Sequence, residues 1–383
     1  MICHNWTDAS GERYTFIDEL ERIVELPTGF MKSKAKRLAT KSRPVYASRL
    51  RRFCQYLEYH PAFGQVQVDV AIKSLSLIVV EDFLISLDAN GLMSSTVRGY
   101  EITIREFCKW LCSSQSGYAL KQDLYANQKF ISRKPVTRLP NLTDATTVIK
   151  LLSRLNFEEH RLVAHFIYDT GLRISEVPRV LKSDIPNPTE YPPDTAYYPL
   201  FVSGSKGPKD QPKGRVTIIS RAMVSRIQKY HNSKQYLQKI HKHPCESRNM
   251  RTKDYPAFLN TEGNPMKVDA IENFIRDASI RAQLRLSAHK LRHGTAYSIL
   301  RSELAPTLID KLVLVQKILG HANLSTTEIY TRVPATALVR GLSGAANSPI
   351  NFRFEEAQRI FDETYIPAHL HQRKRRRLGG IHV

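Results

Sequence analysis

The segment of residues 126–142, ANQKFISRKPVTRLPNL, constrains the fold more than any other part of the sequence. It carries two prolines and four basic residues, and its apolar residues do not repeat with helical spacing. Because proline removes a backbone donor and breaks a helix, we expect an extended linker. It is either a basic strand that follows a phosphate backbone or a plain solvated hinge. In both cases it divides the 383-residue chain into two domains, each long enough for its own core.

The stretch ahead of the linker, residues 42–125, is predicted to be a small helical bundle. Apolar residues recur at steps of three and four over 46–57, which is the spacing of one helical face. The same spacing predicts helices over 79–87 and 97–111. Residues 1–41 have a mixed pattern that ends in a basic run, and we interpret them as an N-terminal arm or short helical extension.

The sequence after the linker combines helices with two strands. Within residues 143–345, the runs Tyr197–Val202 and Arg215–Ile219 flank a loop rich in Gly, Pro and Lys, which predicts a hairpin. A helix is expected over Leu172–Leu181. The predicted fold is therefore mostly α with a small antiparallel β-sheet, as a helical N-terminal domain followed by an α+β domain. Residues 346–383 add one amphipathic helix candidate and a basic tail.

The charge of the chain indicates a polyanionic partner. Lys and Arg number 57 against 36 Asp and Glu, so the net charge is +21. Nucleic acid is the first candidate, because neutralising phosphates releases counterions, and an anionic membrane surface is the second. The most apolar run, Leu75–Leu87, is interrupted by Glu81 and Asp82 and cannot span a bilayer. The five scattered cysteines do not form a disulfide framework, so we expect a cytoplasmic protein, and we predict no metal site.

A phosphodiester can be cut without a metal by a defined set of side chains. Two arginines can hold the non-bridging oxygens and keep their charge. An aligned nucleophile, a base and an acid must complete the set. Each residue alone has a commoner structural role, as a solvated helix face or a packing tyrosine, so the prediction rests on their order in one chain. The candidates are Arg173 and Arg292 for the phosphate, Tyr330 as nucleophile, His289 and His321 for hydrogen bonding and proton transfer, and Lys206 as acid.

Three sequence blocks resemble those of a known family. They are TGLRISE at 170–176, HKLRHGTA at 289–296 and LGHANLSTTEIY at 319–330. These look like the three signature blocks of the tyrosine recombinases, the family of phage integrases and Xer-type recombinases. The resemblance covers residues 42–335, with the segment before the linker similar to the family's core-binding domain. It implies that the α+β domain is catalytic.

The resemblance also implies a role for each residue of the blocks. Tyr330 would attack the scissile phosphate, form a 3′-phosphotyrosine link and free a 5′-hydroxyl. Arg173 and Arg292 would bind that phosphate. His289 would be the base, and His321 a second hydrogen-bonding or acid–base residue.

The resemblance assigns the acid of the reaction to the hairpin loop. Lys206 would protonate the leaving oxygen, but the loop is longer than the family's usual form, so Lys209 or Lys213 are alternatives. Glu176 would orient Arg173 from one turn away. No metal or nucleotide cofactor is implied, because the covalent link conserves the bond energy.

The resemblance further implies the partners. The chain would act on a specific site in double-stranded DNA as a homotetramer that exchanges strands through a four-way junction, with or without a second recombinase or a DNA-bending protein. It would integrate, excise or resolve a mobile DNA element in the nucleoid. Residues 352–366 are the candidate for a helix that docks on the neighbouring subunit. The basic residues expected to contact DNA are Arg49, Arg51, Arg52, Arg98, Lys129, Arg133, Lys134 and Arg138.

Two other functions fit parts of the sequence. One is a type IB topoisomerase, which relaxes DNA with a similar site. The other is a DNA-binding accessory protein or repressor of a mobile element that has lost catalysis. The bundle and the helix beyond Tyr330 argue against the first, and the complete set of candidate side chains argues against the second.

Overall fold

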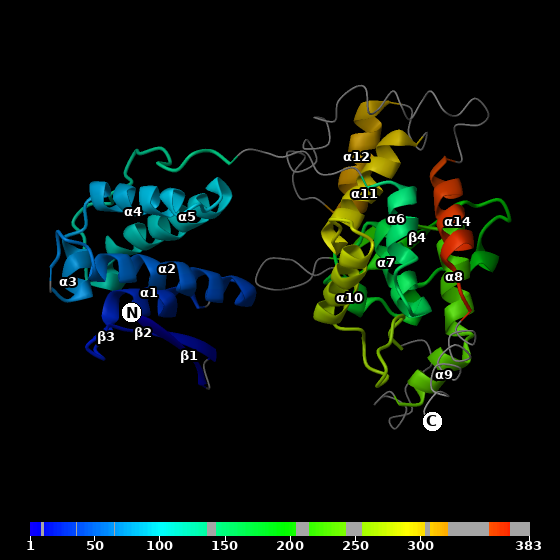
Figure 1. Ribbon diagram of the computed structural model, residues 1–383, viewed down its shortest axis with the longest axis horizontal. Coiled ribbons are helices and arrows are strands. Elements are labelled where there is room, and N and C mark those ends of the chain that lie inside the picture. The colour runs from blue at the N-terminus through cyan, green and yellow to red at the C-terminus, as the bar shows by residue number, and fades with distance from the viewer. Residues whose placement is uncertain are drawn as a thin grey trace, which may run out of the picture. The chain divides into compact units, whose positions relative to one another are not determined.

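A computed structural model describes residues 1–8, 11–35, 37–64, 66–135, 143–203, 214–242, 255–302, 307–320 and 352–367 (Figure 1). The chain separates into two compact units, Met1–Thr137 and Arg138–Val383. Each unit has a core of its own. Helices form most of both units and the sheets are small and antiparallel, which confirms the predicted fold class. No helix in the described ranges has both the length and the apolar character to cross a membrane.

The first unit begins with a sheet that the sequence analysis did not predict. Residues assigned to an arm or short helical extension instead form three antiparallel strands in the order β1-β2-β3, followed by a helix. The reason lies in β2, where Tyr14 and Phe16 alternate with outward-facing residues and are buried in the core. Phe30 of the helix packs edge-on against Phe107. The elements are β1 (Ile2–Asp8), β2 (Gly11–Ile17), β3 (Ile23–Val24) and α1 (Glu25–Lys34).

Four α-helices complete the described part of the first unit, and three of them follow the predicted apolar spacing, while the short helix Val68–Lys73 was not predicted. Leu50, Phe53 and Leu57 are buried along one face of the first of them, while Tyr46 is half-buried beside the same core. The predicted helices over 79–87 and 97–111 are each present and slightly longer. The four are α2 (Arg43–Glu58), α3 (Val68–Lys73), α4 (Leu77–Ala89) and α5 (Ser94–Leu111).

In the second unit, further helices and one hairpin surround a central helix, α7 (Glu158–Thr170) (Figure 1). The hairpin joins Tyr197–Val202 (β4) to Arg215–Ser220 (β5) in antiparallel register and confirms the predicted strands. The helices are α6 (Ala145–Leu152), α7 (Glu158–Thr170), α8 (Arg221–His231), α9 (Lys234–Ile240), α10 (Val268–Arg281), α11 (Ala288–Arg301), α12 (Leu308–Leu319) and α14 (Phe352–Thr364).

The helix predicted over Leu172–Leu181 is wrong. The structure has only a three-residue 3₁₀ turn there, Val177–Arg179. Pro178 supplies no backbone N–H and its ring clashes with a preceding helical turn, so an α-helix cannot run through it. The segment follows Gly171 as an irregular chain, which lets Arg173 and Glu176 bond each other.

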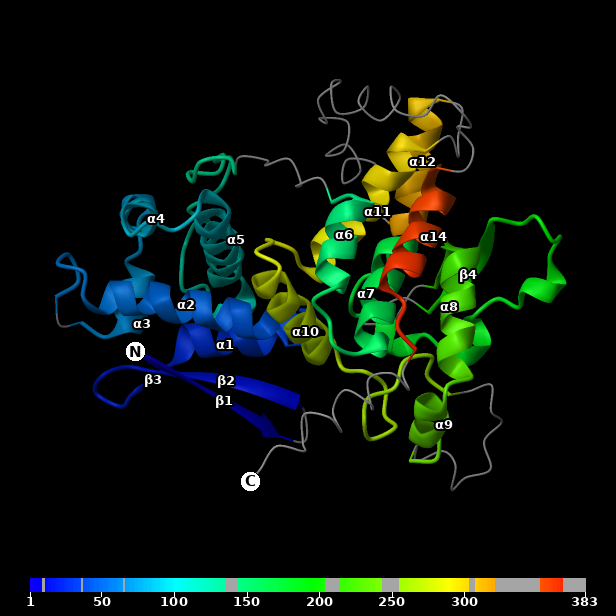
Figure 2. The same cartoon turned by 45° about the vertical axis from the view of Figure 1, so that its right-hand side comes forward.

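Helix α14 packs on its own unit, against α6, α7 and α8 (Figure 2). Buried polar contacts fasten it. Glu356 accepts a hydrogen bond of 2.7 Å from Ser298, and Arg226 donates to the Thr364 hydroxyl over 2.9 Å. Arg226 is itself fully buried and paired with Glu158 at 2.7 Å. The helix is thus a part of the second unit's core in this chain.

Candidate active site

Arg173 is placed by the glycine that ends α7. Gly171 has φ +65°, the left-handed conformation that an L side chain rarely adopts. A Cβ there would lie 2.7 Å from a methyl carbon of Leu319. Glycine therefore lets the end of α7 approach the end of α12 closely. Arg173, two residues later, donates from one guanidinium nitrogen to the carbonyl oxygen of Gly320 over 2.9 Å.

Glu176 joins two arginines from separate segments. It accepts hydrogen bonds from the Arg173 backbone at 2.7 Å and the Arg173 side chain at 3.0 Å. The same carboxylate accepts one from Arg215, at the start of β5, over 2.9 Å. Burial alone would raise the pKa of Glu176, but the charge and hydrogen bonds of Arg215, and then those of Arg173, outweigh it and lower the pKa. Glu176 is therefore an anion that holds both guanidinium groups in place.

Arg292 reaches the same region from α11. Ser287 caps this helix by accepting from the Lys290 N–H at 3.3 Å, and Thr295 fixes it on α7 through a 2.6 Å bond to the Tyr168 carbonyl. The Arg292 side chain is buried and donates to the carbonyl of Gly171 over 2.5 Å. It also donates to the carbonyl of Leu319.

His289 lies one turn before Arg292 and faces a hollow of about 680 Å³. Arg173, Arg292 and Arg276 of α10 also line this hollow, so it is rich in cations. Burial, and then the charge of Arg292, lower the pKa of His289. The imidazole is therefore neutral near neutral pH and able to accept a proton. Three cations can bind an anionic phosphodiester, and a neutral histidine can accept the proton of the nucleophile that attacks it.

The structure brings together four of the seven residues predicted for the active site: Arg173, Glu176, His289 and Arg292. The other three, Lys206, His321 and Tyr330, lie outside the described residues, as do the alternatives Lys209 and Lys213.

Arg215 and Glu272 were not among the site residues predicted from the sequence. Arg215 shares the Glu176 carboxylate, and Glu272 lines the hollow from α10. Arg215 could have been recognised from the sequence, because it is the basic residue that directly follows the hairpin loop. For Glu272 there was no such signal, since it belongs to none of the three sequence blocks.

The basic residues predicted to contact DNA differ in their surroundings. Arg98 stacks on the ring of Phe130 at 3.7 Å and donates to the Ser132 carbonyl over 2.8 Å. Arg105, which was not predicted, also lies over this ring, with its guanidinium carbon 4.6 Å from the ring centroid. Arg98 therefore fixes the first part of the linker on α5. The remaining candidates within the described ranges are Arg49, Arg51, Arg52, Lys129, Arg133 and Lys134, and Arg138 lies outside them.

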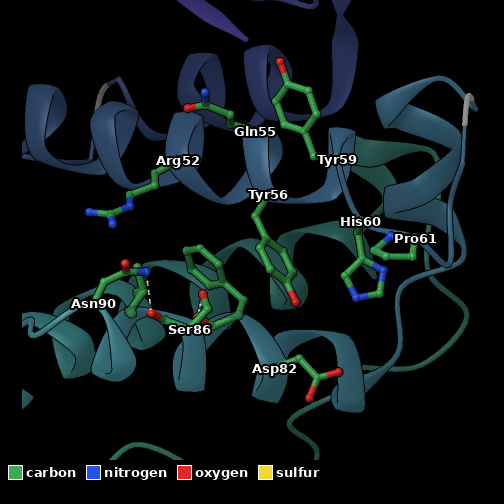
Figure 3. A pocket seen from close by; sticks show the side chains of 11 residues that line it. Arg52, Gln55, Tyr56, Tyr59, His60, Pro61, Asp82, Ser86 and Asn90 are labelled. Carbon is green, nitrogen blue, oxygen red and sulfur yellow. Dashed lines mark hydrogen bonds between the residues drawn. The ribbon is translucent and has the colours of Figure 1, made fainter.

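A second hollow, of about 500 Å³, lies in the first unit between α2 and α4 (Figure 3). Tyr56 points from α2 toward α4, and its ring packs 5.1 Å from Phe83. The lining combines such rings with one cation, Arg52, and one carboxylate, Asp82. It lacks the paired arginines of the other hollow, so we assign the chemistry to the second unit.

Comparison with known proteins agrees with this geometry. Residues 143–336 match the model of the phage integrase family. The tyrosine recombinase XerA of Pyrococcus furiosus is 27% identical over 71% of this chain and 96% of its own length. XerC of Halalkalibacterium halodurans is 29% identical over 75% and 85%.

Solved structures share the fold. XerH site-specific recombinase, bound to its difH substrate after cleavage, aligns with a TM-score of 0.57 and 21% identity over 82% of this chain and 83% of that one. A lambda integrase dimer bound to a core site aligns with a TM-score of 0.56 and 15% identity over 80% and 94%.

The fold and these matches define a site-specific DNA recombinase of the tyrosine type. Because the family model covers just over half of the sequence, the chain belongs to the phage integrase family.

Proposed function

We propose that the chain cuts and rejoins DNA strands by attack of Tyr330 on a scissile phosphate. The phenolic oxygen forms a bond to phosphorus while the bond from phosphorus to the 5′ oxygen breaks, which leaves a 3′-phosphotyrosine and a 5′-hydroxyl. One observation carries this proposal. Arg173 and Arg292 converge on the carbonyls of Gly320 and Leu319, which directly precede His321 in the chain and stand ten and eleven residues before Tyr330.

The proposed roles follow the chemistry of the described site. Arg173 and Arg292 bind the non-bridging oxygens, whose charge grows in the transition state. Glu176 orients Arg173, and the buried ion pair with Arg215 keeps that carboxylate charged. His289 takes the phenolic proton, for which its lowered pKa is suited.

The remaining roles rest on the sequence blocks. Lys206 donates a proton to the leaving 5′ oxygen, with Lys209 and Lys213 as the alternatives in the same loop. His321 hydrogen-bonds the phosphate or assists the proton transfer. The scheme uses no metal and no nucleotide.

Double-stranded DNA is the proposed substrate, and a homotetramer the proposed assembly. The net charge of +21 supports the first, together with a relative solved on its DNA substrate. Helix α2 carries Arg49, Arg51 and Arg52, which are the first residues to test for DNA contact. Helix α14 packs on its own unit in this chain, so the proposed tetramer does not rest on it, and DNA as substrate would locate the protein at the nucleoid. The assembly would form with or without a second recombinase or a DNA-bending protein.

The test uses duplex DNA from the regions flanking the gene, with a footprint to locate the site. A nick is placed so that cleavage traps the enzyme on DNA. The wild type should give a covalent adduct. Tyr330→Phe should give none while still retarding the DNA, and Tyr118→Phe, at a tyrosine that is 65% exposed in the first unit, should behave as the wild type.

Three results would oppose the proposal. An adduct with Tyr330→Phe would remove the nucleophile. Binding without any adduct in the wild type would favour an accessory protein. Relaxation of plasmids that lack the footprinted site would favour a topoisomerase.

A further inference from the structure

A second histidine stands beside His289. His293 lies one turn further along α11, and the Nε2 atoms of the two rings are 2.9 Å apart. The ring centroids are separated by 4.3 Å and the planes cross at 75°. At this distance the N–H of one ring donates to the lone pair of the other. The hydrogen bond occupies Nε2 of both rings, so Nδ1 of His289 is the nitrogen left for the reaction.

The direction of this hydrogen bond decides whether Nδ1 of His289 can accept a proton or only donate one. If His289 donates from Nε2, its Nδ1 carries a lone pair and can accept a proton. If His293 donates instead, Nδ1 of His289 carries the hydrogen and can only donate to a phosphate oxygen. His293 thereby selects the tautomer of His289, as the third group of a nucleophile–base–partner arrangement does.

We propose that His293 is a positioning residue, which fixes the ring and the tautomer of His289 and stabilises the imidazolium that forms during cleavage. The inference rests on the proposed role of His289 as base. The proton of the Tyr330 phenol moves to Nδ1 of His289, whose Nε2–H then donates to the neutral His293 ring. His289 keeps this proton and the positive charge. In the reverse step the phenolic oxygen leaves the phosphorus and takes the proton back.

The charges around the pair favour a single added proton. Arg173 from the segment after α7, Arg276 from α10 and Arg292 from α11 line the hollow beside His289, with Glu272 of α10 as its carboxylate. Three cations oppose a second proton on the pair. His293 is therefore placed to accept the hydrogen bond of the charged His289 ring.

The test is single-turnover cleavage of the nicked duplex as a function of pH, with each protein saturating the DNA. For His293→Ala we expect cleavage about tenfold slower on the plateau, a part of what a general base contributes. The acid limb should move to lower pH, because loss of the acceptor destabilises the charged form of His289 and lowers its pKa. His293→Gln keeps an acceptor oxygen and should recover most of the rate and the wild-type limb.

Controls separate this inference from the proposed function. His4→Ala, at an exposed histidine of β1, should match the wild type, and all variants should bind DNA and melt like it. If His289→Ala cleaves at the wild-type rate, the proposed base is wrong. If His289→Ala is inactive but His293→Ala cleaves normally, or is slower with an unmoved acid limb, or is not rescued by glutamine, only the inference on His293 is wrong.

Discussion

Glu176→Ala should destabilise the second unit more than any surface change. The carboxylate is fully buried, and the side chains of its partners Arg215 and Arg173 are 12% and 29% exposed. Removing one member of a buried ion pair costs about 3–5 kcal/mol, and the partial exposure of the arginines places this case at about 3 kcal/mol. For a unit of this size that corresponds to a melting temperature lower by roughly 6–12 °C.

The assay is thermal unfolding followed by calorimetry, with cleavage of the nicked duplex measured in parallel. Glu262→Ala, at an exposed loop residue of the same unit, is the matched control and should change the free energy of unfolding by less than about 0.5 kcal/mol. Cleavage by Glu176→Ala should fall further than its stability explains, because Arg173 loses two of its hydrogen bonds. A melting temperature within about 2 °C of the wild type would refute the reasoning.

A pH series tests the same carboxylate. Its pKa in the folded chain is below the ordinary value of 4.5, so its stabilisation is fully present above pH 4.5 and is lost as the pH falls through the folded pKa. Glu176→Gln has no such dependence. The stability difference between the wild type and Glu176→Gln should therefore be constant near neutral pH and shrink below pH 4.5. A difference that stays constant into the acid range would contradict the ion-pair account.

Two other substitutions test separate parts of the fold. Phe130→Ala removes the ring that both Arg98 and Arg105 contact, and should lower the first unit's unfolding free energy by about 1–2 kcal/mol. The adjoining linker should be cut faster by protease, and unchanged proteolysis would count against this contact as an anchor. Gly171→Ala places a Cβ 2.7 Å from Leu319 at φ +65° and should destabilise the second unit by about 1–3 kcal/mol, as measured by denaturant unfolding. An unchanged midpoint would show that the two helix ends can separate freely.

The helices of both units were predictable because their apolar residues repeat at helical spacing. An example is the helix face that carries Leu50, Phe53 and Leu57, which are buried as expected. The sheet at the N-terminus was missed because only Tyr14 and Phe16 of β2 show the two-residue period, over a stretch too short to stand out among polar residues. The helix predicted over Leu172–Leu181 does not form, because Pro178 lies beyond the first turn, where proline is not tolerated.

The site was predictable as a set of residues but not as a geometry. Arg173 and Arg292 are far apart in sequence, and they were linked by the chemistry of phosphodiester cleavage, their order in the chain and the family resemblance. That Glu176 also holds Arg215 depends on where β5 begins relative to α7, which no local pattern encodes. The contact of His293 with His289 could have been anticipated, since residues four apart share a helix face.

The identity of the covalently modified residue tests the account most directly. After reaction with the nicked duplex, nuclease and trypsin digestion should yield the peptide of residues 318–332, ILGHANLSTTEIYTR, for mass spectrometry. We predict that this peptide carries a nucleotide on the phenolic oxygen of Tyr330, and that Tyr330→Phe yields only the unmodified peptide. A nucleotide on any other residue, or a modified peptide from Tyr330→Phe, would contradict the proposed mechanism.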